Sequence, residues 1–272
     1  IGNVTKSTSS NQAAVTIQGQ IPVYFSSCRF IDNLGSNFGS AIHFAKTANS
    51  TLALSNCLFW GNRNSATSDP VPLNVSSENF IMINSTVIQS IAGYRHTIRC
   101  GASGGMDKAL MANNIVHNIN ASGDCFYTAA TTYFLRSEGY NQYGKTCLEL
   151  SSGVSLGETY SWTKTGGAPG TNDNAVGVPE DFTAPTEENG YLWSWEMPAD
   201  KEQYLPTTAQ IESLLTSDPV LGGSDGVGTA FVNWLKSVSV RDHNALETDC
   251  YGNLRNASGL WPGCYQKQEA GI

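Results

Sequence analysis

Six ionisable side chains between residues 95 and 124 form the best candidate for chemistry in this sequence. Three basic residues, one histidine and two acids lie within about one turn of the repeat: Arg95, His96, Arg99, Asp107, Lys108 and Asp124. A polysaccharide lyase needs carboxylates that hold Ca²⁺ beside an acidic sugar, with an arginine or lysine base on the same face. A glycoside hydrolase needs two acids that flank the scissile bond. The group is either a catalytic or uronate-binding face or a solvated surface, and the sequence leaves enzymatic activity open while favouring its absence.

A second set of candidates consists of aromatic side chains in and beside an acidic stretch. Residues 173–202 carry eight acids and one base, Lys201. Long loops with aromatic residues often carry function, and these rings could stack on sugars; the alternative is a lid packed over the preceding strands. The glycan-binding candidates are Trp162, Tyr191, Trp193 and Trp195. The acids lack the alternating spacing of a Ca²⁺ loop, so no metal site or cofactor is predicted and Ca²⁺ is only a weak candidate.

A four-residue phrase that returns at a near-constant interval indicates which elements must position these side chains. Its last residues, Phe30, Phe59, Val87 and Val116, lie 29, 28 and 29 positions apart. A unit of this length cannot bury its own apolar face, so such repeats stack on one another. The segments are short, β-branched and punctuated by Asn, Ser and Gly, whereas a helical repeat needs longer amphipathic stretches. We therefore predict an all-β fold, a parallel β-helix in which equivalent residues of adjacent coils lie about 4.8 Å apart.

The strands and turns of this array can be placed along the chain. Apolar positions alternate within the phrase, so Phe30 is expected to face inward, and Arg29 with its equivalents to face outward. Asn33, Asn62 and Asn114 stand where the coils must turn. We expect left-handed backbone there, with amide side chains bonded to backbone or to an Asn of the next coil; an ordinary loop role is the alternative. The predicted strands are residues 15–17, 23–25, 41–44, 52–54, 80–83 and 96–99.

Seven cysteines do not form a recognisable metal site, because they include no C-x-x-C pair with a matching histidine pair. Cys28 and Cys57 occupy equivalent inward positions, so we expect stacked buried thiols rather than a disulfide. Cys250 and Cys264 flank a turn rich in Gly and Asn, and they are the first pair to test for a bridge. The odd total leaves at least one cysteine without an intrachain partner.

The sequence divides into three regions. We expect β-helix coils over residues 1–150, an acidic, aromatic-rich loop region over 151–205 packed on the coils, and a C-terminal cap over 206–272. The cap is expected to contain two short helices, one over 207–215 that begins with Thr207 as its capping residue. The other, near 229–238, places Phe231, Trp234 and Leu235 on one stripe. We expect such a helix to lie across the end of the β-helix and to cover its open edge.

Composition excludes some partners. The 272 residues carry a net charge of −8 and no cluster of Lys and Arg that could neutralise a run of phosphates, which argues against nucleic acid. No apolar stretch approaches the length that spans a bilayer. Since Ile1 follows no initiator Met, we expect a processed or partial product in which an upstream segment or a partner chain covers the first strands.

Two groups of phrases resemble known bacterial surface proteins. Residues 28–33 followed by 38–44 resemble the repeat of polymorphic outer-membrane proteins, in which Cys-x-Phe-x-x-Asn precedes Gly-Gly-Ala-Ile, with Ser40 in place of the second Gly. Residues 113–116, 139–141, 249–255 and 261–266 are similar to the last coils of right-handed β-helix proteins of the choice-of-anchor type, with Cys264 in place of the usual Ala. The resemblance implies a right-handed, pectate-lyase-like solenoid that is secreted or held at the outer membrane or cell surface of a Gram-negative bacterium.

Three hypotheses for function follow. The first is a non-catalytic, surface-exposed β-helix that acts in adhesion, with a surface glycan or a protein as its partner. The second is a polysaccharide lyase or glycoside hydrolase that acts on an acidic glycan through residues 95–108. The third is a structural subunit or fragment of a larger surface assembly. No two acids of the repeat region fall at equivalent positions of adjacent coils, which favours the first hypothesis.

Overall fold

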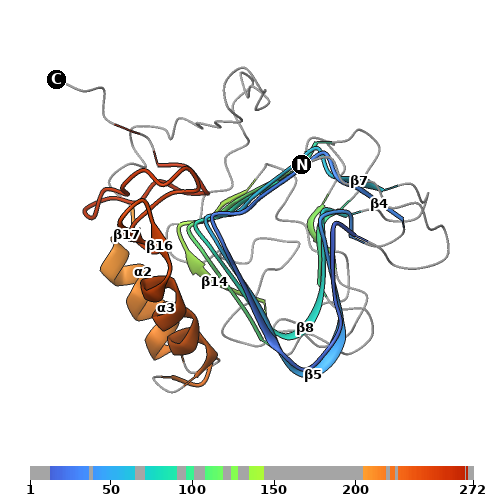
Figure 1. The fold of residues 1–272 in the computed structure, drawn as a ribbon, viewed down its shortest axis with the longest axis horizontal. Helices are drawn as coiled ribbons and strands as arrows, with labels where there is room; N and C mark the ends of the chain where they lie inside the picture. Colours follow the sequence, from blue (N-terminus) through green and yellow to red (C-terminus); the bar gives the residue numbers. More distant parts are fainter. Residues whose placement is uncertain are drawn as a thin grey trace, which may run out of the picture.

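The computed structural model describes residues 13–36, 39–64, 71–90, 96–100, 108–118, 124–127, 135–143, 205–218, 221–223, 226–266 and 268. These residues form an eight-stranded and a five-stranded sheet, both with parallel pairing, together with two short helices (Figure 1). The fold is therefore mostly β, as predicted.

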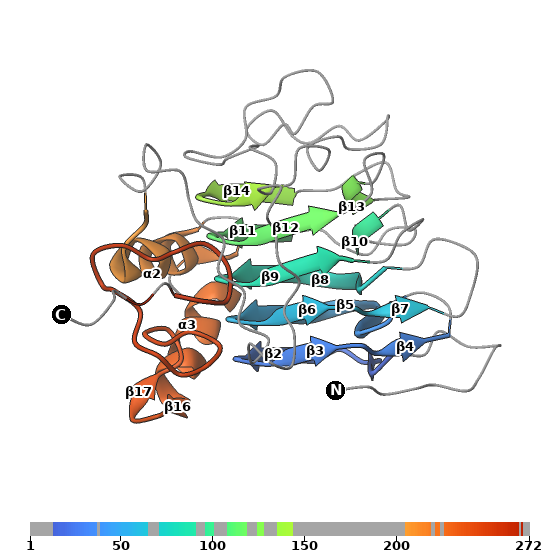
Figure 2. The same cartoon turned by 90° about the horizontal axis from the view of Figure 1, so that it is seen from above.

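The strands lie in three rows, and within each row the chain returns to pair in parallel with the preceding strand (Figure 2). The β1 row contains β1 (Val15–Ile17), the first parts of β5 (Ile42–Ser55) and β8 (Leu73–Ile83), β10 (His96–Cys100) and β13 (Asp124–Tyr127). The β2 row contains β2 (Pro22–Ser26), the second parts of β5 and β8, β11 (Lys108–Ala112) and β14 (Leu135–Gly139). The β3 row contains β3 (Arg29–Ile31), β6 (Leu58–Trp60), β9 (Thr86–Gln89), β12 (Ile115–Asn118) and β15 (Gln142–Tyr143), and a short pair joins β4 (Leu34–Gly35) to β7 (Arg63–Asn64).

The spacing of the repeated phrase is the register of the β3 row. Phe30 pairs with Phe59, Phe59 with Val87, and Val87 with Val116. The rings of Phe30 and Phe59 stack with their centroids 4.7 Å apart and their planes 3° from parallel. The interval of 28 or 29 residues is thus the length of chain between neighbouring strands of one row, which confirms the predicted pairing.

Left-handed residues stand at the corners between strands, one position earlier than predicted. The sequence predicts left-handed geometry at Asn33, Asn62 and Asn114, and this prediction is wrong. In each case the left-handed residue is the preceding one: Asp32 (φ 52°), Gly61 (φ 66°) and Asn113 (φ 55°). The first residue of every phrase adopts this geometry: Ser27, Asn56, Asn84, Asn113 and also Tyr140. A left-handed corner redirects the chain, and the side chain after it is then free to point into the stack.

The asparagines after these corners form the predicted amide ladders. Asn33 donates through Nδ2 to Oδ1 of Asn62 at 2.7 Å, and Asn62 donates to the carbonyl of Phe30 at 2.8 Å. Asn114 donates in the same way to Oδ1 of Asn141 at 2.9 Å. We call one turn of the chain through the three rows a rung. Each of these buried amides bonds to a residue of a neighbouring rung, so the ladder satisfies polar groups that water cannot reach.

One apolar core fills the space between the three rows. Its members alternate along each strand with outward-facing residues, which is the pattern expected of strands that bury one face. Phe44, Leu54, Phe59, Phe80 and Met82 are each 0% exposed and belong to this core. Burial of side chains of this size supplies the main stabilisation of the stacked rows.

Two helices follow the strand rows, and the first begins as predicted. Helix α2 (Thr208–Ser217) is capped by Thr207, whose hydroxyl accepts a hydrogen bond from the Gln210 backbone N–H at 3.1 Å. The Gln210 side chain accepts in turn from the Thr207 backbone N–H at 2.7 Å. This reciprocal capping box satisfies two donors at the helix start. Helix α3 spans Val227–Ser237.

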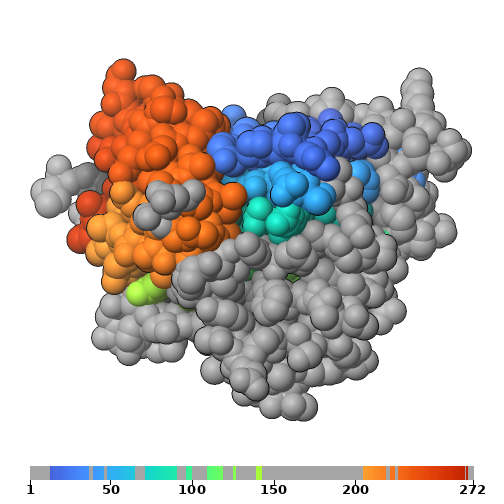
Figure 3. Space-filling model, turned by 90° about the horizontal axis from the view of Figure 1, so that it is seen from below, coloured from blue at the N-terminus to red at the C-terminus, as the bar shows by residue number. Residues whose placement is uncertain are grey.

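The placement of the helices differs from the prediction. They pack on the outer side of the β2 row instead of lying across an end of the stack (Figure 2). Tyr24 of β2 contacts the rings of Phe231 and Trp234 of α3, at centroid distances of 5.3 and 5.5 Å. In the space-filling view the helices lie beside the first strands, which form one edge of the stack (Figure 3). The physical reason is that the β2 row is apolar on both faces: Ala53, Ile81 and Leu110 point outward, and the helices bury them completely.

The C-terminal segment covers the outer side of the β3 row. It follows the antiparallel pair β16 (Ser239–Val240) and β17 (His243–Asn244). Arg29 and its equivalents face outward from the core, as predicted, but only Arg29 is exposed; Leu58, Thr86 and Ile115 are 1%, 1% and 5% exposed. The sequence did not predict this burial, which arises because the C-terminal segment packs on them.

Arg255 attaches this segment to the strands through a buried guanidinium group. Two of its nitrogens donate to Oδ1 of Asn56, at 3.1 and 2.8 Å. It also donates to the carbonyls of Thr248, Trp261 and Gly263, at 3.2, 3.2 and 2.8 Å. Asn56 is the left-handed corner residue of the second phrase, so the corner of the repeat is also the anchoring point of the C-terminal segment.

Among the described residues, four cysteines carry free thiols: Cys28, Cys57, Cys250 and Cys264. The Cys28 and Cys57 thiols are neighbours in the core, as predicted. Cys250 and Cys264, the first pair to test for a bridge, are adjacent but not bridged in this structure. Cys125 is disulfide-bonded. Neither helix in the described part of the chain has the length and apolar character needed to cross a bilayer.

Candidate functional site

A column of polar residues runs along the outer face of the β1 row. The backbone register pairs Thr16 with His43, His43 with Asn74, and Asn74 with Arg99. Each lies between residues of the inner core, as His43 lies between Ile42 and Phe44. Side chains alternate along a strand, so this register places one polar side chain above another on successive rungs. We call these four residues the polar column.

The polar column contains a neutral histidine. His43 Nδ1 and Asn74 Nδ2 are 2.9 Å apart, and because the amide nitrogen can only donate, the ring nitrogen accepts. Burial lowers the pKa of His43, and the positive charge of Arg99 lowers it further. Both effects oppose protonation, so His43 is an uncharged side chain that keeps Nδ1 as an acceptor at neutral pH.

The amide oxygen of Asn74 is an acceptor that receives no hydrogen bond from the described part of the chain. It is buried and has no hydrogen-bond partner among the described residues. An unpaired acceptor in a buried position costs about 1–3 kcal/mol, so a hydroxyl or N–H group that reached it would be bound favourably. The next residue of the column, Arg99, can only donate.

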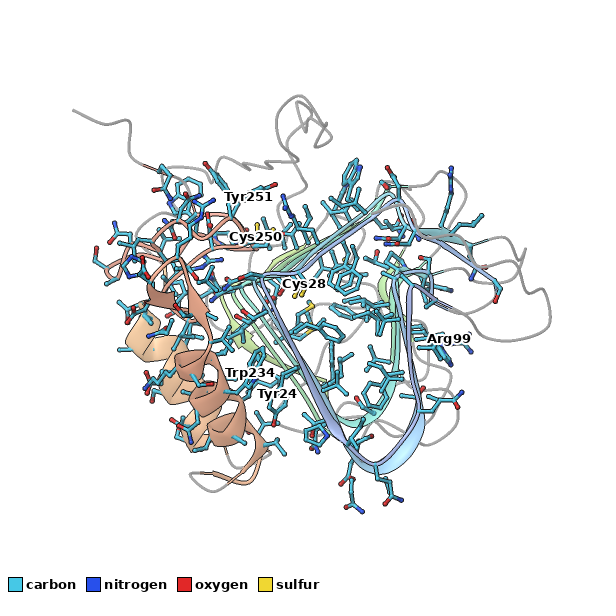
Figure 4. The ribbon with its side chains drawn as sticks, viewed as in Figure 1. Tyr24, Cys28, Arg99, Trp234, Cys250 and Tyr251 are labelled. Carbon is cyan, nitrogen blue, oxygen red and sulfur yellow. The ribbon has the colours of Figure 1, made fainter. Side chains whose placement is uncertain are left out.

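Only the first residue of the polar column is exposed. Thr16 is exposed, whereas His43, Asn74 and Arg99 are 7%, 2% and 9% exposed. Arg99 lies on the outer side of its strand, away from the core between the rows (Figure 4).

The polar column suits a ligand that combines hydroxyl groups with a negative charge. Asn74 can accept from a hydroxyl, while a guanidinium group binds a carboxylate with two parallel hydrogen bonds. Hydrogen bonds to a charged group contribute about 1.5–3 kcal/mol each, more than neutral ones. These complementary groups are those of a sugar acid.

Only part of the group predicted from the sequence comes together. Arg99 lies in the polar column, and His96 lies three residues before it on β10. The backbone of Asp124 on β13 is directly opposite that of His96. Lys108 is in a different place, because it begins β11 in the β2 row and pairs with Asn79. Arg95 and Asp107 lie outside the described residues.

The aromatic candidates Trp162, Tyr191, Trp193 and Trp195 also lie outside the described residues, as does most of the region 151–205. Among the residues that are described, no group of three or more His, Cys, Asp or Glu side chains could hold a metal ion. The described polar column therefore rests on hydrogen bonding and on the charge of one arginine.

Sequence reasoning missed His43 and Asn74 as partners of Arg99. The β3 row repeats every 27 to 29 residues, but members of the polar column are separated by 27, 31 and 25 residues at positions 16, 43, 74 and 99. Loops of variable length between the rungs produce this irregularity. The alternation of polar and apolar residues within each strand was the only signal, and it does not reveal which strands are neighbours.

Comparisons with protein-family models, with curated proteins and with solved structures gave no match to this chain.

Proposed function

We propose that this protein is a right-handed parallel β-helix of the Gram-negative cell surface that binds an acidic glycan without cleaving it. The β-helix is supported by three parallel rows that share one core and by the near-constant interval between their rungs. The surface location is supported by the resemblance of the repeat and of the C-terminal phrases to exported proteins.

Two features of adjacent strands carry the glycan proposal. Asn74 has a buried amide oxygen that receives no hydrogen bond from the described residues, and Arg99, which has a guanidinium group, is directly opposite it in the strand register. A sugar hydroxyl would satisfy the first, and a uronate carboxylate would bind the second. His43 contributes by holding the amide nitrogen of Asn74, which fixes the direction in which the amide oxygen points.

Cleavage of an acidic glycan, by a polysaccharide lyase or glycoside hydrolase activity, remains a second candidate function because of one observation. His96 and Asp124 are directly opposite on adjacent strands, and Arg99 lies on the same strand as His96. A base and an acid within one rung of an arginine could act on a bound uronate. We favour binding because the unsatisfied acceptor is in the polar column, where the other members beside the uncharged His43 are Thr16, Asn74 and Arg99, and an arginine stays protonated in proteins, so none of them can act as its proton-exchange partner.

The test is a titration with polygalacturonate, with neutral dextran as the comparison ligand. Wild-type protein should bind the first and not the second, and added salt should weaken the binding. Arg99→Met should raise the Kd at least tenfold, because it removes a charged hydrogen bond of about 1.5–3 kcal/mol. Arg63→Met is the matched control, since Arg63 is an exposed arginine on β7, which pairs with β4 and not with the strands of the column; it should leave the Kd unchanged.

Two further outcomes separate the hypotheses. Growth of unsaturated product absorbance or of reducing ends, lost in Arg99→Met, would replace binding by catalysis. Loss of binding in Trp193→Ala/Trp195→Ala with full binding in Arg99→Met would move the site to the aromatic residues. Folding of each variant is checked by circular dichroism before titration.

A further inference from the structure

Two buried cysteines of the C-terminal segment face one another across a closed loop. The Cys250 backbone N–H donates to the carbonyl of Cys264 at 2.8 Å. Their thiols are within hydrogen-bonding reach, and the side chains are 7% and 2% exposed. A backbone hydrogen bond between two residues brings their Cα atoms into the separation range that a disulfide requires.

We propose that Cys250 and Cys264 are an oxidisable dithiol, whose conversion to a disulfide locks the C-terminal segment onto the β3 row. The loop between them contains Arg255, so the same bridge would hold the guanidinium group against Asn56. The pair lies on the outer side of the row, in a cluster with Ile31 and Leu58. Cys28 and Cys57 lie on the inner side, in the core.

The surroundings give the two thiols different roles. Burial alone would raise the pKa of Cys264, but hydrogen bonds with Cys250 and Thr86 and the charge of Arg255 lower it below its usual range. Burial raises the pKa of Cys250, and the hydrogen bond with Cys264 raises it further. Thiolate is the attacking form in disulfide exchange, so Cys264 is the attacking residue and Cys250 the resolving one.

The reaction needs a disulfide as oxidant, for which oxidised glutathione serves as the probe. The Cys264 thiolate attacks one glutathione sulfur, which forms a mixed disulfide and releases one glutathione thiolate that takes up the proton lost by Cys264. Cys250, deprotonated in turn, attacks the Cys264 sulfur and releases the second glutathione. Two protein thiols are oxidised and one glutathione disulfide is reduced to two thiols. Cys125 is already disulfide-bonded, and disulfides persist where such oxidants are available.

The experiment incubates the folded protein with oxidised glutathione, quenches with acid, alkylates the remaining thiols and maps the peptides by mass spectrometry. We expect the peptides of Cys250 and Cys264 to be linked, while Cys28 and Cys57 stay alkylated. In Cys250→Ala, glutathione should accumulate on Cys264; in Cys264→Ala, Cys250 should stay unmodified. A bridge between Cys28 and Cys57 with both outer thiols still free would overturn the proposal.

Locking is measured separately by the urea midpoint. The oxidised wild type should unfold at a higher urea concentration than the reduced wild type, and the double variant Cys250→Ala/Cys264→Ala should show no response to oxidant. If the bridge forms and the midpoint is unchanged, the locking role is wrong. If both single variants lose native circular dichroism, native wild-type protein is treated with a limiting amount of oxidised glutathione, and the first cysteine to form a mixed disulfide is identified. Reaction at Cys250 first would contradict the assigned roles.

Discussion

Replacing Arg255 with leucine should destabilise the protein by about 3 kcal/mol. The guanidinium group makes five hydrogen bonds to Asn56 and to three backbone carbonyls. At about 1.5 kcal/mol for each bond to a charged donor, the sum is about 7.5 kcal/mol. The guanidinium group is buried, and recovering its desolvation penalty offsets several kcal/mol of that sum.

The loss should appear first in the C-terminal segment. We expect the urea midpoint to fall and hydrogen exchange to accelerate at the backbone amides of Cys250 and Gly263, whose hydrogen bonds hold that segment in place. The amides of the strand rows should exchange more slowly than these until global unfolding. The measurements are urea denaturation followed by circular dichroism and native-state hydrogen exchange with mass spectrometry.

The control for Arg255→Leu is Arg63→Leu, which removes an exposed arginine and should change the free energy of unfolding by less than about 0.5 kcal/mol. A double-mutant cycle with Asn56→Ala should give a coupling energy of about 1–2 kcal/mol, because the two side chains share two hydrogen bonds. A change below 1 kcal/mol in Arg255→Leu, or additive effects in the cycle, would refute the anchoring role.

Three other variants test other parts of the fold. Phe59→Ala should cost about 3–5 kcal/mol in urea denaturation, because Phe59 is 0% exposed and stacks on Phe30. Burial lowers the pKa of His117 from 6.5 to about 4, so the unfolded chain binds more protons between these values. The free energy of unfolding should therefore fall as the pH drops through that window, by up to about 3 kcal/mol, and His117→Gln should reduce the slope. Gly263→Ala should loosen the C-terminal segment and so accelerate hydrogen exchange of its backbone amides. The added Cβ would lie 2.5 Å from Oγ1 of Thr86, and the residue has a φ of 83°.

Each of these predictions can be contradicted by a stated result, and the glycine variant also has a matched control. Gly223→Ala is matched to Gly263→Ala, since Gly223 also has a positive φ of 63° but nothing lies within 4 Å of an added Cβ. It should show only the backbone penalty of about 1 kcal/mol. Equal effects of the two alanines, equal pH slopes in wild type and His117→Gln, or a Phe59→Ala cost under 1 kcal/mol would each contradict the corresponding explanation.

The strand rows could be predicted because one interval sets both the sequence pattern and the pairing. Phe30 and Phe59 are neighbours in space for the same reason that their phrases are similar: each rung must bury the same inward positions. The start of helix α2 was also predictable, since Thr207 and Gln210 form a local capping motif. Both features depend on residues close in sequence or on a strict period.

The remainder depends on contacts between distant segments that carry no period. Leu58 and Ile115 read as outward residues of the repeat, and nothing local to them indicates that residues 245–266 cover them. The outer face of the β2 row is apolar, with Ala53 and Ile81, and it requires a cover. Nothing in these residues shows that α2 and α3 supply it. The polar column was hidden because Asn74 and Arg99 are separated by a loop of a different length from the other rungs.

The most direct test of the glycan proposal is a crystal structure of the protein with a short oligogalacturonate. The proposal predicts a uronate carboxylate within about 3 Å of the Arg99 guanidinium group and a sugar hydroxyl within the same distance of the Asn74 amide oxygen. An ordered oligosaccharide bound elsewhere, with the polar column unoccupied at saturating ligand, would contradict it.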